Sequence, residues 1–310
     1  KKEKINGLVL DLRDNGGGSL QTVVDITGYF IKTGPVVQVK STGGKKQVLR
    51  DRDPSIIWNG PLVVLVNELS ASASEILAAA LQDYNRAIVI GSKQTFGKGT
   101  VQNVVDLNKI IAGNSYGNLG ALKLTTDKFY RINGGSTQLE GVKSDIIFPN
   151  RYSFIEIGEK DQENPLPWDF IGSAQFSPSD TKNNFEYVQN ESNKRIVSNT
   201  YLNLLKEEAK WVKEQQDQYK YSLNYSEFVR NRDSIVKISK KFDKIGNYRS
   251  DLIIDWIEKD RLEIDVNNSF KEKRARWKEI LIKDIQLNEA INILSDIVQK
   301  QKAPILASSR

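Results

Sequence analysis

The chain has 310 residues, of which 39% are hydrophobic and 27% are charged, which is typical of a folded protein of about two domains rather than a disordered one. It contains no histidine and no cysteine, which excludes Ser-His-Asp triads, Cys-His dyads, zinc-thiolate sites and disulfides. The net charge of +6 arises from mixed charges in the second half, which indicates solvated helix faces, so no nucleic-acid partner is expected.

The first half of the chain alternates short apolar runs with glycine-rich turns and helical stretches. Continuous apolar strands that alternate with helices predict an α/β domain whose sheet is covered on both faces. Strands are predicted at residues 7–12, 61–66, 87–91, 101–107 and 119–126, and helices at 20–31 and 74–81.

The composition changes near residue 150. Pro165 and Pro167 stand among charged residues in 158–169, which is typical of a linker. From residue 186 onward, glycine and proline are rare, and apolar residues three and four apart predict helices at 201–219 and 271–300. The predicted organisation is a core at 1–155, a linker at 156–185 and a helical C-terminal domain at 186–310.

The first candidate site is the turn DLRDNGGGS at residues 11–19, which directly follows a predicted strand. Consecutive glycines let the backbone adopt positive φ and leave amides that can bind an oxyanion or a phosphate. No Gly-Lys-Ser/Thr follows, so the turn is not a P-loop. The alternative interpretation is an ordinary strand-to-helix turn.

The second candidate is LSASASEILAAAL at residues 69–81, where serines begin a predicted helix. The free amides and the helix dipole there favour negative charge, which suits a serine nucleophile. The pattern equally predicts a capping box, with Ser72 as N-cap and Glu75 three residues later. The pattern alone leaves Ser70, Ser72 and Ser74 as alternative nucleophiles.

The third candidate is QTFGKGTVQ at residues 94–102, in which Lys98 lies between two glycines. Small neighbours let its amine lie close to other groups, and partial burial favours the neutral form that a general base needs. Gln102 is placed to accept a hydrogen bond from this amine. The alternative interpretation is a solvated loop lysine.

All three segments follow apolar strands, and the ends of neighbouring strands can converge on one pocket. Because histidine and cysteine are absent, serine with lysine is the pair left for acyl transfer. The three segments together therefore indicate acyl chemistry more specifically than any one of them does.

The chain resembles the C-terminal processing peptidases, which are Ser-Lys serine proteases with a ClpP/crotonase-like core. The resemblance covers nearly all of residues 7–150 and is strongest to the tail-specific protease branch, which continues into a helical C-terminal domain. It lies in the segments GLVLDLRDNGGGS, VLVNELSASASEILAAALQDYNRAIVIGSKQTFGKGTVQ and DKFYRINGGSTQLEGVKSDIIFPN.

Position by position, the resemblance places the family's nucleophile on Ser72, its general base on Lys98 and its lysine-orienting glutamine on Gln102. The oxyanion amides fall on Gly17 and Ala73. It implies peptide hydrolysis through an acyl-enzyme without a metal or other cofactor, with an extended substrate paired to the strand at 119–126. Glu75 is expected to cap its helix rather than to react.

The sequence departs from the family pattern in three ways. The loop at 92–94 is one residue longer than usual, Ser144 replaces a proline, and the PDZ domain and the sequence before the first strand are absent. The resemblance implies protein or peptide substrates that are cut near their C-termini in the bacterial periplasm, at a membrane face. It further implies an adaptor or lipoprotein partner, with membrane association only through parts that are not in this chain.

Two alternatives stay open. A crotonase-like acyl-CoA enzyme would use the glycine turn to hold a thioester oxyanion, but it leaves the Ser-Lys pair unexplained. A non-catalytic scaffold would bind a partner through the helical C-terminal domain, and it would have no use for Ser72, Lys98 and Gln102.

Overall fold

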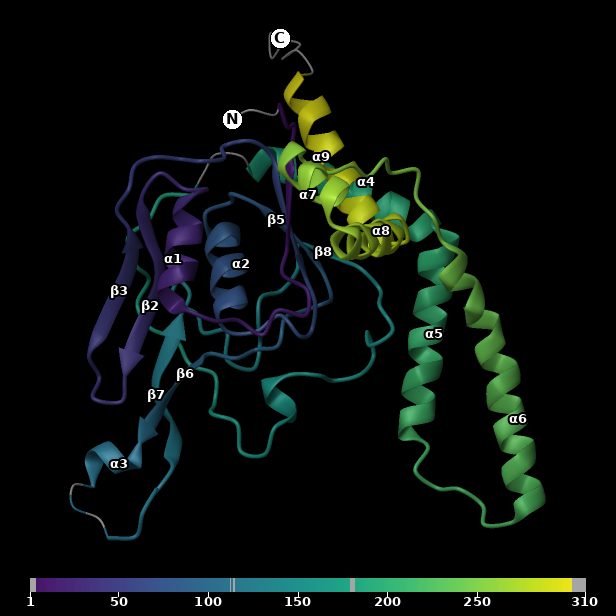
Figure 1. Ribbon diagram of the computed structural model, residues 1–310, viewed down its shortest axis with the longest axis horizontal. Helices are drawn as coiled ribbons and strands as arrows, with labels where there is room; N and C mark the ends of the chain where they lie inside the picture. Colours follow the sequence, from purple (N-terminus) through teal and green to yellow (C-terminus); the bar gives the residue numbers. More distant parts are fainter. Residues whose placement is uncertain (1–3, 112, 114, 179–181, 303–310) are drawn as a thin grey trace, which may run out of the picture.

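The computed structural model describes residues 4–111, 113, 115–178 and 182–302 of the chain. Its centre is a parallel four-stranded sheet in the order β1-β4-β5-β8 (Figure 1). Its strands are β1 (Leu8–Asp11), β4 (Leu62–Val66), β5 (Ile88–Gly91) and β8 (Ile146–Ile147). Strands β4 and β5 are buried along their whole length, which explains their unbroken apolar sequences.

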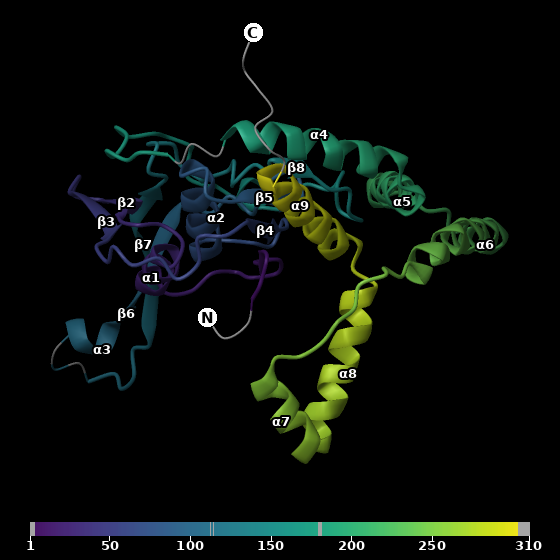
Figure 2. The same ribbon diagram turned by 90° about the horizontal axis from the view of Figure 1, so that it is seen from above.

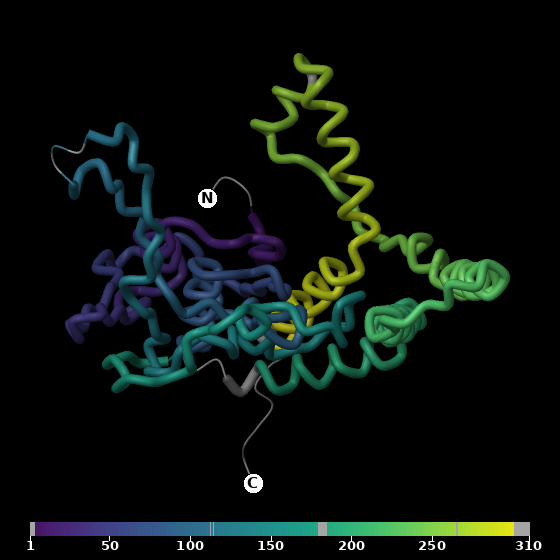
Figure 3. Tube along the Cα trace, turned by 90° about the horizontal axis from the view of Figure 1, so that it is seen from below, coloured from purple at the N-terminus to yellow at the C-terminus, as the bar shows by residue number. Residues whose placement is uncertain are grey.

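A second, antiparallel sheet has the order β3-β2-β7-β6. The hairpin of β6 and β7 extends away from the body and carries the short helix α3 at its tip (Figures 1 and 3). Its elements are β2 (Gly34–Ser41), β3 (Lys46–Asp51), β6 (Thr100–Asp106), α3 (Leu107–Ile110) and β7 (Ala121–Tyr130). The sequence did not predict β2 and β3, because only β2 carries a short buried apolar run and β3 is largely exposed.

Helices α1 (Leu20–Gly28) and α2 (Ala73–Asp83) pack on one face of the parallel sheet. Alternate residues of β4 point toward this face, because successive side chains of a strand lie on opposite sides. The resulting core includes Leu62, Val64 and Val66 of β4 together with the alanine-rich side of α2.

The opposite face of the same sheet is covered by α4 (Lys182–Ser198) and α9 (Ile285–Lys302), which lie side by side (Figure 2). Val63 and Leu65 of β4 point toward these helices and share a core with Ile293 of α9. The last described helix therefore completes the core that the first strands begin.

The remaining helices extend from the body as two hairpins (Figures 1 and 2). One consists of α5 (Thr200–Asp217) and α6 (Tyr225–Phe242), and the other of α7 (Glu258–Val266) and α8 (Asn268–Ile282). The window at 271–300, which the sequence predicts to be helical, is divided between α8 and α9, because the chain breaks after Ile282. The carboxylate of Asp284 accepts hydrogen bonds from the amides of Gln286 at 3.0 Å and Leu287 at 2.9 Å, and so begins a new helix.

The segment predicted as a linker lies against the core over much of its length. The indole of Trp168 donates to the Ser136 carbonyl at 3.0 Å, and the amide of Ala174 donates to the Ile132 carbonyl at 2.8 Å. Residues 179–181 of the predicted linker lie outside the described residues. The same holds for residues 1–3 of the predicted core and 303–310 of the predicted helical domain. The division into two domains stays a prediction.

The fold class is confirmed: an α/β core is followed by a mainly helical region. Among the helices in the described part of the chain, none combines the length and the apolar character needed to cross a bilayer.

We expect the substitution Ile293→Ala to lower the free energy of unfolding by about 2–5 kcal/mol, because Ile293 is fully buried between α9 and the sheet. Urea denaturation of the purified protein measures this change. Ile280→Ala is the matched control, since Ile280 is 63% exposed on α8, and its effect should stay within about 0.5 kcal/mol. Equal effects of the two substitutions would contradict the packing of α9 against the core.

Candidate active site

One pocket of about 370 Å³ brings the three candidate segments together. The glycine turn follows β1, the serine segment follows β4 and the lysine loop follows β5, so all three lie at the carboxyl ends of parallel strands. The pocket is lined by all five predicted site residues, which are Gly17, Ser72, Ala73, Lys98 and Gln102.

Ser72 adopts an unusual backbone conformation directly before α2, with φ of 56° and ψ of −115°. Positive φ at a residue other than glycine is strained by about 1–3 kcal/mol and persists only where the surroundings enforce it. Here the amide of Ser72 donates to the Glu75 carboxylate at 2.8 Å, and its carbonyl accepts from the Ile76 amide at 3.0 Å. These bonds hold the Ser72 side chain at the pocket.

The neighbouring serines are placed differently. Ser70 is completely buried, and its hydroxyl donates to the Leu12 carbonyl at 2.7 Å while it accepts from the Asn67 amide at 3.0 Å. Ser74 is 4% exposed. Of the three serines, only Ser72 lines the pocket.

Lys98 lies between Gly97 and Gly99, and the backbone geometry requires glycine at both positions. Gly97 has φ of +90°, and a Cβ on Gly99 would lie only 2.7 Å from the Gln138 amide nitrogen. The half-buried Lys98 side chain points its amine toward Gln102, whose Oε1 lies 3.4 Å from Nζ. This distance allows only a weak hydrogen bond.

The buried carboxylate of Glu75 connects the serine turn to the lysine loop. Besides the Ser72 amide it accepts hydrogen bonds from the Thr95 hydroxyl at 2.6 Å and from the amides of Gly97 at 2.7 Å and Lys98 at 3.0 Å. Burial raises the pKa of Glu75 to about 7, because the loss of water penalises the charge more than the four donors stabilise it. The sequence predicted only the helix cap, since nothing in it marks contacts to a loop twenty residues away.

Gly17 packs directly on the serine turn. It has φ of +99°, and a Cβ there would lie 2.7 Å from the Ala71 carbonyl oxygen and 2.8 Å from the Ala73 nitrogen. Ala73 is the first residue of α2, where amides lack partners within the helix. The Gly17 amide donates to Oδ1 of Asn15 at 2.9 Å, so an oxyanion must displace the Asn15 side chain to use this donor.

Sequence reasoning missed the other walls of the pocket. Leu20, Ile76, Val101 and Phe129 supply apolar surface, and Lys123 of β7 adds a second cation. They come from four elements, so no local pattern could group them. Within the part of the chain that the structure describes, no cluster of three or more acidic residues could hold a metal ion.

Two family models together match almost the whole chain. The model of peptidase family S41 matches residues 1–148, and the model of the C-terminal domain of tail specific protease (DUF3340) matches residues 152–299. The chain belongs to the S41 peptidase family. The two matches meet close to residue 150, where the composition of the sequence changes.

The chain spans less than half the length of the first two curated relatives that it matches. The chain is 38% identical to the tail-specific protease of Haemophilus influenzae over 97% of its own length and 44% of that relative. It is 38% identical to the carboxy-terminal-processing protease of Bartonella bacilliformis over 59% of its length and 43% of that relative. Among solved structures, the photosystem II D1 C-terminal processing protease matches with 35% identity and a TM-score of 0.41, over 46% of this chain and 35% of that chain.

We expect Glu75→Gln to remove a pH dependence of stability. The pKa of Glu75 is about 7 in the folded protein against 4.5 for an unperturbed group, so the folded state binds more protons between these two values. Stability contributed by the protonated carboxyl is therefore present below pH 4.5 and is lost as the pH rises toward 7.

Urea unfolding at a series of pH values across this range measures the effect. The wild-type free energy of unfolding should carry a decline with rising pH that the Glu75→Gln variant lacks. The control is Glu140→Gln, whose half-exposed carboxylate pairs with Lys143 at the surface, and this variant should keep the wild-type slope. An unchanged slope in Glu75→Gln would contradict the raised pKa.

Proposed function

We propose that the protein is a serine endopeptidase that hydrolyses protein substrates near their C-termini through an acyl-enzyme. Ser72 is the nucleophile, Lys98 the general base and Gln102 the residue that orients the lysine. The observation that carries this proposal is the single pocket that these residues share with Gly17 and Ala73, in a chain without any histidine. The names of the relatives support the C-terminal preference.

Acylation begins when the neutral amine of Lys98 takes the proton of the Ser72 hydroxyl. The Ser72 Oγ forms a bond to the scissile carbonyl carbon, and the carbonyl oxygen becomes an oxyanion. The amides of Gly17 and Ala73 bind this oxyanion, and one such donor is worth about 3 kcal/mol in comparable enzymes. When the carbon–nitrogen bond breaks, Lys98 returns its proton to the leaving amine.

Deacylation reverses these roles with water. Lys98 takes a proton from a water molecule, whose oxygen attacks the ester carbonyl carbon of the acyl-enzyme. The bond between that carbon and Ser72 Oγ then breaks, and Lys98 gives its proton back to the Ser72 oxygen. The acid product leaves, and the enzyme regains its starting protonation.

An extended peptide fits beside β7 in this proposal. Residues 121–125 of β7 pair with β6, whereas β2 pairs with β7 only at 127–130 and the Thr42 amide donates to the Thr126 carbonyl at 3.1 Å. Backbone groups on the other edge of 121–125 are thus available for a substrate strand. The apolar walls of Leu20, Ile76 and Phe129 would receive a substrate side chain next to the scissile bond.

We also propose that the protein works in the bacterial periplasm at a membrane face, with an adaptor or lipoprotein as partner. This part rests on the resemblance to tail-specific proteases. A chain without cysteine suits an oxidising compartment, because it has no thiol to protect.

We expect Ser72→Ala and Lys98→Ala each to lower the hydrolysis of an unfolded protein such as casein by about ten-thousandfold or more, because each removes an essential half of the dyad. A fluorophosphonate probe should label the wild type and leave Ser72→Ala unlabelled. These measurements use the full-length natural protein.

Ser74→Ala is the control for the nucleophile, since Ser74 lies two residues away but does not line the pocket, and it should keep its labelling. Full activity of Ser72→Ala would show that the nucleophile is assigned wrongly. Activity with acyl-CoA thioesters in place of peptides would favour a crotonase-like enzyme, and the absence of both activities from the wild type would favour a scaffold.

We expect Gly17→Ala to lower activity by about a hundredfold or more, because the added Cβ would lie 2.7 Å from the Ala71 carbonyl oxygen and displace an oxyanion donor. Gly16→Ala is the matched control, since a Cβ on Gly16 would meet nothing within 4 Å. Its kcat should stay within about twofold of wild type. If the two substitutions cost the same activity, the Gly17 amide is not an oxyanion donor.

A further inference from the structure

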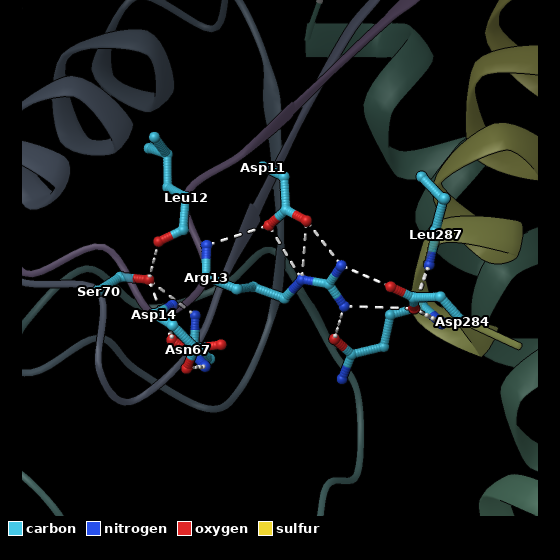
Figure 4. A network of polar contacts seen from close by, with 9 residues as sticks. Asp11, Leu12, Arg13, Asp14, Asn67, Ser70, Asp284 and Leu287 are labelled. Carbon is cyan, nitrogen blue, oxygen red and sulfur yellow. Dashed lines mark hydrogen bonds and ion pairs between the residues drawn. The ribbon is translucent and has the colours of Figure 1, made fainter. Parts of the chain in front are cut away.

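Arg13 joins the glycine turn to the start of helix α9 (Figure 4). Its guanidinium donates two hydrogen bonds to Asp284, from Nη2 at 2.6 Å and from Nη1 at 3.2 Å, and a third to Gln286 at 3.1 Å. On its other side it donates to Asp11 from Nε at 2.9 Å and from Nη2 at 2.7 Å. One cation thus connects two carboxylates that are 273 residues apart in the sequence.

Asp284 has two tasks at this position. It caps α9, and at the same time it pairs with Arg13. Both side chains are largely buried, since that of Asp284 is 15% exposed and that of Arg13 is 19% exposed. Burial alone would lower the pKa of Arg13, but the hydrogen bonds and charges of Asp11 and Asp284 outweigh it and raise the pKa above its ordinary value. The ion pair is therefore charged, bidentate and shielded from solvent, which makes it directional and strong.

The residues on either side of Arg13 form hydrogen bonds with the loop that carries the serines. Asp14, with φ of 58°, donates its amide to Asn67 Oδ1 at 2.9 Å and accepts from Asn67 Nδ2 at 2.7 Å. The Leu12 carbonyl accepts from the Ser70 hydroxyl at 2.7 Å (Figure 4). The segment that leads into the glycine turn is thus fixed by the core on one side and by α9 on the other.

We propose that Asp284 is a positioning residue for the active site: through Arg13 it holds the segment that presents the Gly17 amide to the pocket. This inference rests on the proposed function for its catalytic consequence, whereas the mechanical link does not depend on it. The helical C-terminal region then does more than cover the sheet, because the start of α9 sets the geometry of the oxyanion turn.

The test compares Asp284→Asn with Asp296→Asn in the full-length natural protein. Asparagine keeps the volume and caps a helix as well as aspartate does, so Asp284→Asn removes the charged pair with Arg13 and spares the start of α9. Asp296 is the matched control, since it lies on the same helix that Asp284 caps, is 16% exposed and pairs at 2.7 Å with Arg195 of α4, away from the turn.

Two readouts separate positioning from general stability. Hydrogen exchange of the amides in residues 12–18 should become about tenfold faster in Asp284→Asn and stay unchanged in Asp296→Asn. In peptide hydrolysis, kcat of Asp284→Asn should fall about tenfold with KM within about twofold, because the turn acts in the transition state. Asp284→Glu, which keeps the charge, should recover part of the lost kcat.

Unchanged exchange in residues 12–18, or equal changes in the two asparagine variants, would overturn the proposal. Faster exchange without a loss of kcat would also overturn it, since the turn would then move without affecting catalysis. Full activity of Ser72→Ala in the same series would instead reject the proposed function, while the exchange measurement would still decide whether Asp284 holds the turn.

Discussion

The burial of β4 on both faces is the constraint on which the rest of the structure depends. A strand of five apolar residues needs two apolar layers, because its alternate side chains point in opposite directions. Helices α1 and α2 supply one layer, and α4 and α9 supply the other. The second layer comes from residues more than a hundred positions away, so the helical region has to fold back onto the sheet.

The geometry of the candidate site follows from the same sheet. Parallel strands deliver the glycine turn, the serine turn and the lysine loop to one edge, but this alone would leave three separate loops. The buried carboxylate of Glu75 binds amides of both Ser72 and Lys98, and Arg13 with Asp284 anchors the glycine turn to α9. Polar groups that are shielded from water thus set the positions of the loops, since their hydrogen bonds are directional and costly to lose.

Most strands and helices of the core could be predicted from the sequence, because continuous apolar runs and glycine turns are local signals. Strands β2 and β3 were missed, since antiparallel pairing rather than a hydrophobic pattern defines most of their length. The helical pattern at 271–300 does not reveal the break before α9, because the apolar spacing continues across it while the cap at Asp284 interrupts the backbone. Local patterns carry no information about such long-range partners.

By itself, the sequence determined the α/β class, the helical C-terminal region, the restriction to serine and lysine chemistry, and the three segments that line the pocket. Only the tertiary structure decided which serine of the three lies at the pocket surface, and it did so by burying Ser70 and Ser74. It also decided that Glu75 ties two loops together and that Asp284 reaches the glycine turn. These contacts join residues far apart in the chain, and only the packing of the whole chain brings such residues within hydrogen-bonding distance.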